Sequence, residues 1–123
     1  MEREELEARS FALAAAIFRF CGGFRNLPGG RGPADQLVDC ATSVGSNYRA
    51  TARARSRAEF IAKLALVAEE ADETVFWLEF TGRVGLGERA VADQLLAEAK
   101  ELRAIFAASY GTARRNAQSR RVR

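Results

Sequence analysis

The 123-residue sequence contains no histidine, and it has only two prolines and two cysteines. Histidine is the usual general base at neutral pH, a member of the Ser-His-Asp and Cys-His catalytic groups, and the commonest zinc ligand. Its absence argues against most hydrolase chemistry. We therefore expect a protein that is not an enzyme, with no catalytic residue, no bound metal and no cofactor.

Long apolar runs are also missing. The longest, from Phe11 to Phe18, has eight residues, whereas a helix that crosses a bilayer needs about 20. The acidic start of the chain differs from the basic start of a secretory leader. The composition, 48% hydrophobic and 28% charged, is typical of one globular domain. These features predict a cytoplasmic protein that does not bind membranes.

The two cysteines, Cys21 and Cys40, stand 19 positions apart and form no CxxC pair. They therefore cannot supply a structural zinc site or a thioredoxin-like redox motif. In a reducing cytosol, a cysteine is usually a small buried thiol. We predict two buried thiols rather than a disulfide.

Apolar residues recur with a helical period in four segments, and no segment alternates as a strand does. Glycine-rich strings end the first and third segments. A capping box, Ser56-Arg-Ala-Glu59, marks the start of the third. The expected helices span about residues 2–21, 33–55, 56–80 and 88–109 or slightly beyond.

Four helices of about 20 residues, with three linkers, account for nearly the whole chain. The predicted fold class is all-α, an antiparallel up-down-up-down four-helix bundle over residues 1–113. Residues 114–123 are expected to form a basic C-terminal tail. In the first helix, Phe11 and Phe18 belong to a broad apolar stripe.

The expected third helix carries a second stripe, roughly opposite its inward apolar stripe. A tryptophan and a leucine on an outer face need cover, either from another helix of the chain or from another subunit. We predict that this stripe is an oligomer interface. Its residues are Leu66, Glu70, Glu73 and Trp77.

Positive charge is concentrated in two stretches. The net charge is +3, and the last ten residues carry five arginines and no acid, which leaves −2 for the first 113 residues. Between Cys40 and Ala58 the chain has four arginines and no carboxylate. Arginine supplies 17 of the 19 cationic residues and favours planar, bidentate contacts with phosphate or carboxylate.

A basic helix face that continues into a basic connection could contact several phosphates. A solvated basic surface explains the same pattern equally well. The candidate nucleic-acid-binding residues are Arg49, Arg53, Arg55, Arg57, Arg114 and Arg115.

Other motifs have simpler interpretations. The glycine-rich strings lack the Gly-Lys-Ser/Thr signature and the preceding strand of a phosphate-binding loop, so we interpret them as helix caps and linkers. The carboxylates at 69–73 resemble di-iron ligands, but such sites also use histidine. Ser43 with Asn47, and Glu70 with Glu73, are candidates for hydrogen bonds between helices, with a solvated flank as the equal alternative.

Three motifs within residues 36–79 resemble the four-helix-bundle family named after proteins encoded in intervening sequences of bacterial 23S ribosomal RNA. They are Ser43-Val-Gly-Ser-Asn-Tyr-Arg49, Ser56-Arg-Ala-Glu-Phe60 and Glu73-Thr-Val-Phe-Trp-Leu-Glu79. The resemblance implies an all-helical bundle whose subunits assemble into a ring-like homopentamer. A related branch includes the accessory protein of diversity-generating retroelements, a basic pentameric barrel that binds a reverse transcriptase and nucleic acid.

By position, several residues correspond to recurring polar and aromatic positions of this family, none with a catalytic assignment known to us. They are Ser43, Asn47, Arg49, Glu70, Glu73 and Trp77. Two features depart from the family pattern. Ala50 stands where relatives commonly have glutamate, and the first linker is rich in glycine and lacks their Phe-Pro.

The leading hypothesis is a non-enzymatic homo-oligomeric scaffold, with the pentamer favoured. It would bind RNA or DNA, or a reverse transcriptase or other nucleic-acid enzyme, through its arginines. The alternative is a protein-interaction module that uses Trp77, Leu66 and Phe76 and has no nucleic-acid role. A weaker third hypothesis is an enzyme that uses Glu70 and Glu73 as acid and base.

Overall fold

Four helices make up almost the entire chain. The computed structural model describes the backbone of residues 1–122 and the side chains of residues 1–120, and it has no strand within that range. The all-helical prediction is confirmed. The helices are α1 (Arg3–Gly22), α2 (Arg31–Thr51), α3 (Arg57–Val84) and α4 (Arg89–Val122).

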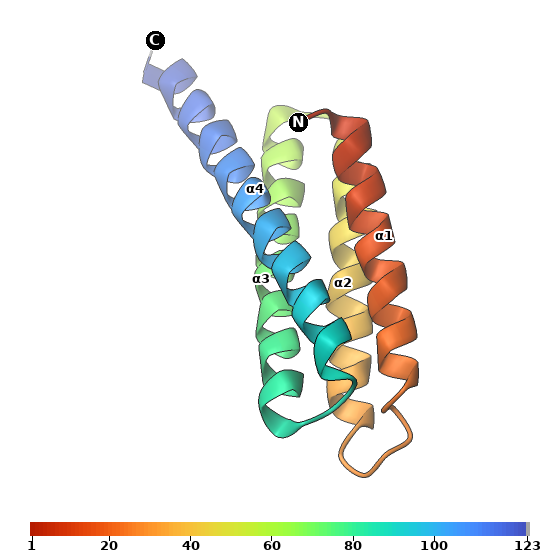
Figure 1. Cartoon of the computed structure of the whole chain (residues 1–123). Coiled ribbons are helices and arrows are strands. Elements are labelled where there is room, and N and C mark those ends of the chain that lie inside the picture. Colours follow the sequence, from red (N-terminus) through yellow and green to blue (C-terminus); the bar gives the residue numbers. More distant parts are fainter. Residues whose placement is uncertain (123) are drawn as a thin grey trace.

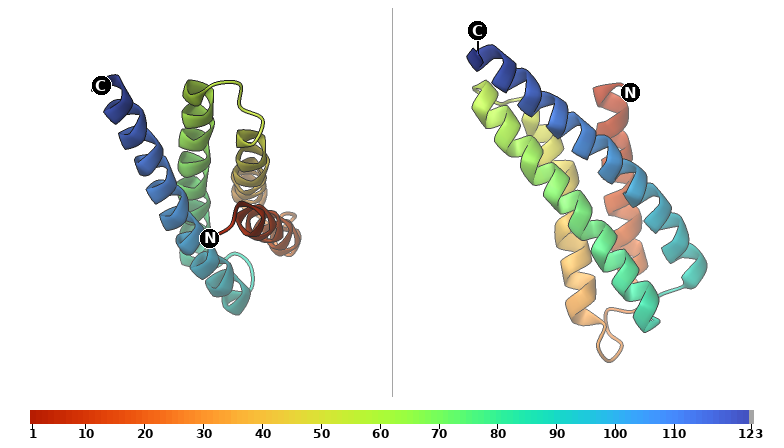
Figure 2. Two further views of the ribbon diagram at one scale, coloured as in Figure 1. Left: turned by 90° about the horizontal axis from the view of Figure 1, so that it is seen from above. Right: turned by 90° about the vertical axis from the view of Figure 1, so that its left-hand side faces the viewer.

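Each helix runs back alongside the one before it (Figure 1). α2 packs against α1 and α3, and α3 packs against α4. α1 and α4 meet over a smaller area, because α4 diverges from α1 toward the C-terminus (Figure 2). α1 and α3 lie on a diagonal, and within the described residues their backbones stay farther apart than those of neighbouring helices.

The start and the end of α3 follow from local chemistry. The Ser56 hydroxyl accepts a hydrogen bond from the backbone N–H of Glu59 at 3.0 Å, as the capping-box pattern predicts. At the other end, Gly85 adopts a left-handed conformation with φ +76°, which glycine reaches without a Cβ clash. The backbone N–H of Leu86 then donates to the Thr81 carbonyl at 2.9 Å. Residues at the two ends of α3 therefore fix where this helix begins and ends.

The glycine-rich connection between α1 and α2 folds tightly over the end of α1. Phe24 is buried there and meets the Phe20 ring edge-on, with centroids 5.2 Å apart. A Cβ on Gly30 would lie 1.9 Å from the Phe24 carbonyl oxygen, so only glycine fits. The connection packs against the core and has the linker role that its sequence indicated.

The core lies between the four helices. Its largest fully buried side chains include Ile17, Leu37, Leu78, Leu102 and Phe106. The inward stripe predicted for α3 is buried from Leu64 to Leu78. Each such aliphatic or aromatic side chain contributes about 1.5–3 kcal/mol when it leaves water.

Cys21 and Cys40 are both free and buried, as predicted. Burial raises the pKa of the Cys21 thiol to about 11. Burial likewise raises the pKa of Cys40. Both thiols therefore stay protonated at neutral pH and react slowly.

α4 is longer than its apolar pattern indicates. The stripe thins after Phe106, yet the helix continues to Val122, so the segment predicted as a basic tail is helical as far as that residue. Alanine, arginine and glutamine in this stretch favour helix without any packing. At 34 residues, α4 is about 50 Å long and projects beyond the other helices (Figure 1).

None of the described helices is long and apolar enough to cross a membrane.

Candidate functional site

A basic pocket lies where α2 ends and α3 begins. It has a volume of about 300 Å³ and is formed by the last turns of α2, the connection and the first turns of α3. Three of the predicted arginines contribute to it, with one lysine and one carboxylate. The lining residues are Ser46, Arg49, Ala50, Arg53, Arg55, Glu59 and Lys63.

The cations of the basic pocket have no ion-pair partner among the described residues: Arg49, Arg53 and Arg55 pair with no carboxylate there. Glu59 contributes a carboxylate to the lining, and its backbone N–H is already used by the Ser56 cap. An arginine without an internal partner keeps its planar donors available for a phosphate.

Arg57 stands apart from this group. It lines a different cavity, of about 500 Å³, with Arg3, Tyr48 and Phe60 on one side and Asn116 of α4 on the other. The sequence suggested one continuous row of four arginines. The first turn of α3 instead directs Arg57 away from the other three and toward α4.

The two predicted arginines of α4 are exposed near its end. The Arg114 guanidinium lies over the Tyr110 ring, 5.7 Å from its centroid. Arg115 donates to the Thr112 hydroxyl at 3.2 Å. This end of α4 lies at the same end of the molecule as the α2–α3 connection (Figure 1). The two basic stretches of the sequence are thus brought toward one end of the fold.

The predicted polar pairs lie on α2 and α3. The Asn47 amide donates to the Ser43 hydroxyl at 2.8 Å and to its carbonyl at 2.9 Å, so it bonds within α2 rather than between helices. Burial, and then the neighbouring Glu73 carboxylate, raise the pKa of Glu70. No cluster of three or more metal-ligating side chains occurs within the described part of the chain.

The outer face of α3 carries an aromatic cluster, which we define as Phe76, Trp77 and Phe80. The ring centroids of Phe76 and Trp77 are 5.1 Å apart, and those of Trp77 and Phe80 are 5.5 Å apart. Phe76 is 57% exposed, whereas Trp77 is half-buried against the core. The open rings are thus Phe76 and Phe80, which the sequence interpretation placed outside its interface stripe.

Leu66, Glu70 and Glu73 of the predicted interface stripe differ in exposure. Leu66 is 38% exposed and Glu73 is also exposed, while Glu70 is half-buried. The aromatic cluster therefore lies at only one end of the stripe. The sequence indicates the aromatic cluster through the one-turn spacing of two phenylalanines beside the tryptophan.

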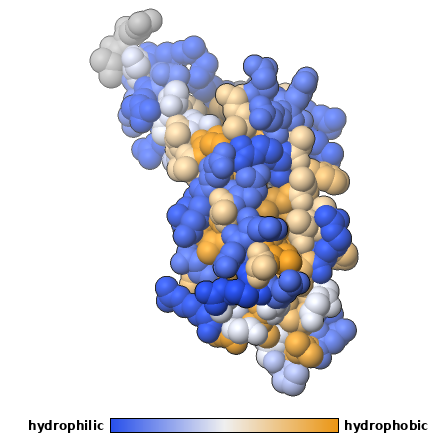
Figure 3. Space-filling view, in the orientation of Figure 1, coloured by the Kyte–Doolittle hydropathy of each residue, from blue (hydrophilic) through white to orange (hydrophobic). Residues whose placement is uncertain are grey.

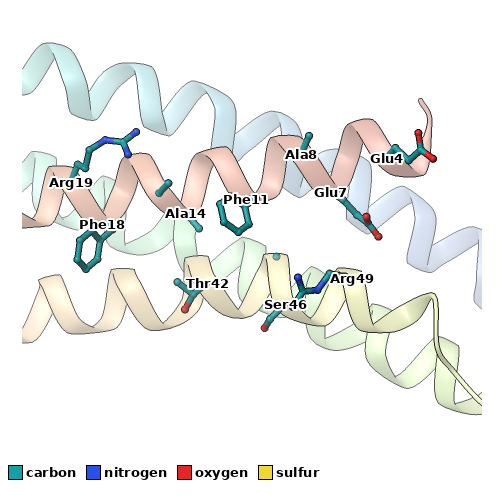
Figure 4. A pocket seen from close by; sticks show the side chains of 12 residues that line it. Glu4, Glu7, Ala8, Phe11, Ala14, Phe18, Arg19, Thr42, Ser46 and Arg49 are labelled. Carbon is teal, nitrogen blue, oxygen red and sulfur yellow. The ribbon is translucent and has the colours of Figure 1, made fainter.

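An apolar groove runs between α1 and α2. Its volume is about 640 Å³, and Phe11 and Phe18 extend into it from α1 toward α2 (Figure 4). Both rings are largely exposed, at 72% and 66%, although the sequence grouped them with the apolar stripe of the first helix. Small residues line the groove beside the two rings. They are Ala8, Ala14, Ala15 and Gly45.

Charged side chains surround the apolar groove. Glu4 and Glu7 stand near the start of α1, Arg19 near its end, and Arg49 on α2 (Figure 4). Arg49 and Ser46 line both the groove and the basic pocket. On the face seen in Figure 3, apolar residues reach the surface along the body, while the projecting end of α4 is hydrophilic.

Comparison with known proteins identifies the family. The sequence model of the 23S rRNA-intervening sequence protein family matches residues 4–108. The chain belongs to this family. The match includes the basic pocket, the aromatic cluster and the apolar groove, and it ends before Arg114 and Arg115.

The chain is also similar to a solved structure, described as a protein with unknown function from the S23 ribosomal protein family from Bacteroides thetaiotaomicron. The two chains are 26% identical and superpose with a TM-score of 0.81. The alignment covers 90% of this chain and 99% of the other. A comparison with curated proteins gives no match.

One departure from the family resemblance falls inside the basic pocket. Ala50, where the family resemblance implies glutamate, lines the basic pocket. A carboxylate there would partly neutralise the arginines on either side, one of which, Arg49, is adjacent in sequence. With alanine, the three arginines, the lysine and Glu59 give the pocket lining a net charge of +3, against +2 with glutamate.

Proposed function

We propose that this protein is a non-enzymatic, homo-oligomeric scaffold that binds nucleic acid through the basic pocket. The observation that carries the proposal is the convergence of Arg49, Arg53 and Arg55, with Lys63, on one pocket in which none has an ion-pair partner among the described residues. The subunit of the proposed assembly is an antiparallel up-down-up-down bundle.

The proposed mechanism is electrostatic. Guanidinium groups donate pairs of hydrogen bonds to phosphate oxygens, and each neutralised phosphate releases counterions. Such contacts fix the position of the polyanion but carry little sequence information. Binding is therefore expected to be strongly salt-dependent and weakly sequence-dependent. Arg114 and Arg115, which are exposed near the end of α4, supply two further cations.

Assembly would strengthen this binding. A ring repeats the basic pocket around an axis, so several modest contacts act together on one polyanion. We propose a closed ring of identical subunits, with five favoured by the family resemblance. A reverse transcriptase or another nucleic-acid enzyme is the protein partner that this role would serve.

A fluorescence anisotropy titration tests the proposal. Structured RNA and duplex DNA are titrated with the protein at two salt concentrations, and we expect binding at low salt that weakens steeply at high salt. Replacement of Arg49, Arg53 and Arg55 together by alanine should abolish most of the binding. Absence of binding by the unchanged protein at low salt would refute the nucleic-acid role.

A matched control is available at the opposite end of the bundle. Arg25, Arg31 and Arg89 lie in the α1–α2 connection and where α2 and α4 begin, and all three are exposed. Their combined replacement by alanine removes the same charge. We expect this control variant to bind nearly as well as the unchanged protein. Equal losses in both variants would mean that net charge, and not the basic pocket, governs binding.

The exposed aromatic cluster favours a second candidate, a protein-interaction module without a nucleic-acid role. In that case the arginine substitutions should leave binding of the partner protein unchanged. Replacement of Phe76 should then release a different protein from the purified complex. Recovery of such a partner, with an association that does not depend on RNA, would favour this alternative.

A further inference from the structure

We infer that the apolar groove of one copy receives the aromatic cluster of a second copy, so that identical chains join head to tail. The inference rests on the homo-oligomeric part of the proposed function and identifies its two contacting surfaces. Both surfaces are apolar and exposed on the same chain, with Phe11 and Phe18 on α1, and Phe76 and Phe80 on α3.

The two surfaces cannot cover each other within one chain. The groove lies between α1 and α2, whereas the aromatic cluster lies on the outer side of α3, where Phe76 and Phe80 border α4 through Arg103. α1 and α3 occupy diagonal positions in the bundle rather than neighbouring ones. A contact that pairs one patch with a different patch is heterologous, and repetition of such a contact forms a ring or a filament.

The ring spacings of the two surfaces are compatible. Phe11 and Phe18 are seven residues apart, which separates them by about 10 Å along α1. Alanines and Gly45 floor the space between them, so a side chain from outside can enter. The Phe76 and Phe80 rings have centroids 6.2 Å apart. One of them can therefore enter the space between the two α1 rings, about 5 Å from each, while the other packs beyond Phe11 or Phe18. Aromatic side chains in such edge contacts gain stability beyond their buried area.

The charges next to these surfaces indicate the orientation. Glu4 precedes Phe11 on α1 and Arg19 follows Phe18, so this face changes from negative to positive. On α3 the order is the same, with Glu73 before the aromatic cluster and Arg83 after it. An antiparallel arrangement of the two helices therefore brings opposite charges together.

These charges are also available for contact. None of Glu4, Arg19, Glu73 and Arg83 makes an ion pair with another described residue. The spacing of the rings and the order of these four charges thus support a second copy of the chain as the occupant of the groove.

Two single substitutions test the pairing, with mass measured by light scattering during size-exclusion chromatography. Phe11→Glu disables the groove and Phe76→Glu disables the aromatic cluster, and both sites are exposed, so helical circular dichroism should be unchanged. Each variant alone should lose the oligomer and elute with the mass of one chain. Leu27→Glu, at a 55% exposed leucine outside both surfaces, should keep the oligomeric mass.

A mixture of the two variants gives the decisive readout. Phe76→Glu retains an intact groove and Phe11→Glu an intact aromatic cluster, so an equimolar mixture can form one productive contact. We expect a dimer, and no larger species, in the mixture. Two variants that each dissociate but form no dimer together would overturn the head-to-tail pairing.

Other outcomes separate this inference from the proposed function. If the unchanged protein is an oligomer and both variants keep its mass, the inference is overturned while the assembly stands. If the unchanged protein is a single chain, both the inference and the proposed assembly fail. RNA titration of the same samples measures the nucleic-acid role independently of either result.

Discussion

Arginine serves two different purposes in two regions of this molecule. Between α1 and α4, Arg9 donates to both carboxylate oxygens of Glu98, at 2.9 and 2.6 Å, and reaches Glu101 at 3.0 Å. At the α2–α3 connection, Arg49 and Arg53 have no such partner among the described residues. The same residue type thus holds helices together in one region and is left available for a ligand in the other.

Charge counts alone are ambiguous for this reason. The net charge of +3 does not distinguish an arginine that is satisfied within the chain from one that is open to a phosphate. The positions of the carboxylates decide between these roles. They lie beside Arg9, and they are almost absent from the lining of the basic pocket among the described residues.

The largest effect is expected at the internally paired arginine. Arg9→Ala removes a bidentate contact whose arginine side chain is only 20% exposed, and it should lower the free energy of unfolding by about 2 kcal/mol. Thermal denaturation followed by circular dichroism measures this loss. Arg9→Lys keeps the charge but not the fork of donors, so it should recover only part of the stability. Unchanged RNA affinity in both variants would sharpen the distinction between the two regions.

An intermediate effect is expected in the basic pocket. Arg53→Ala should leave stability within about 0.5 kcal/mol, because the side chain is exposed and has no ion-pair partner among the described residues. RNA affinity should fall by about three- to tenfold, and the slope of log K against log salt should decrease by about one. Anisotropy titrations at several salt concentrations provide both values. A large loss of stability with no change in that slope would contradict the assigned role.

The smallest effect on stability is expected at Glu70, whose carboxylate lies near that of Glu73. Burial and the Glu73 charge raise the pKa of Glu70 in the folded chain above its unfolded value, so its ionised form lowers stability at high pH. Below the unfolded pKa, Glu70 is protonated in both states and this cost disappears. Glu70→Gln should therefore raise Tm slightly at about pH 7 and leave it unchanged at about pH 3. A lower Tm of the variant at neutral pH would show that the charge is stabilising.

Much of the fold follows from the sequence because its signals are local. The Ser56 cap and the inward stripe of α3 depend on residues within one or two turns of each other, and both are found in the structure. The length of α4 was missed because the apolar pattern marks only the packed part of a helix. The last turns of α4 continue through intrinsic helix propensity.

The surfaces were harder to predict because they depend on neighbouring helices. Phe11 and Phe18 fit a broad apolar stripe, and the sequence does not specify how far around α1 its neighbours extend. α2 covers one edge of that stripe and leaves these two rings open. Similarly, Trp77 turns toward the core while Phe76, its neighbour in sequence, turns outward.

Ser46 and Arg49 form a wall common to the apolar groove and the basic pocket. A guanidinium that is drawn toward a polyanion on one side of that wall is no longer placed to meet a subunit on the other. In the proposed assembly, occupancy of either cavity would change the affinity of the other, and thermodynamic linkage would require the two factors to be equal. The strength with which the proposed subunits hold one another would then depend, through Arg49, on the polyanion concentration around them.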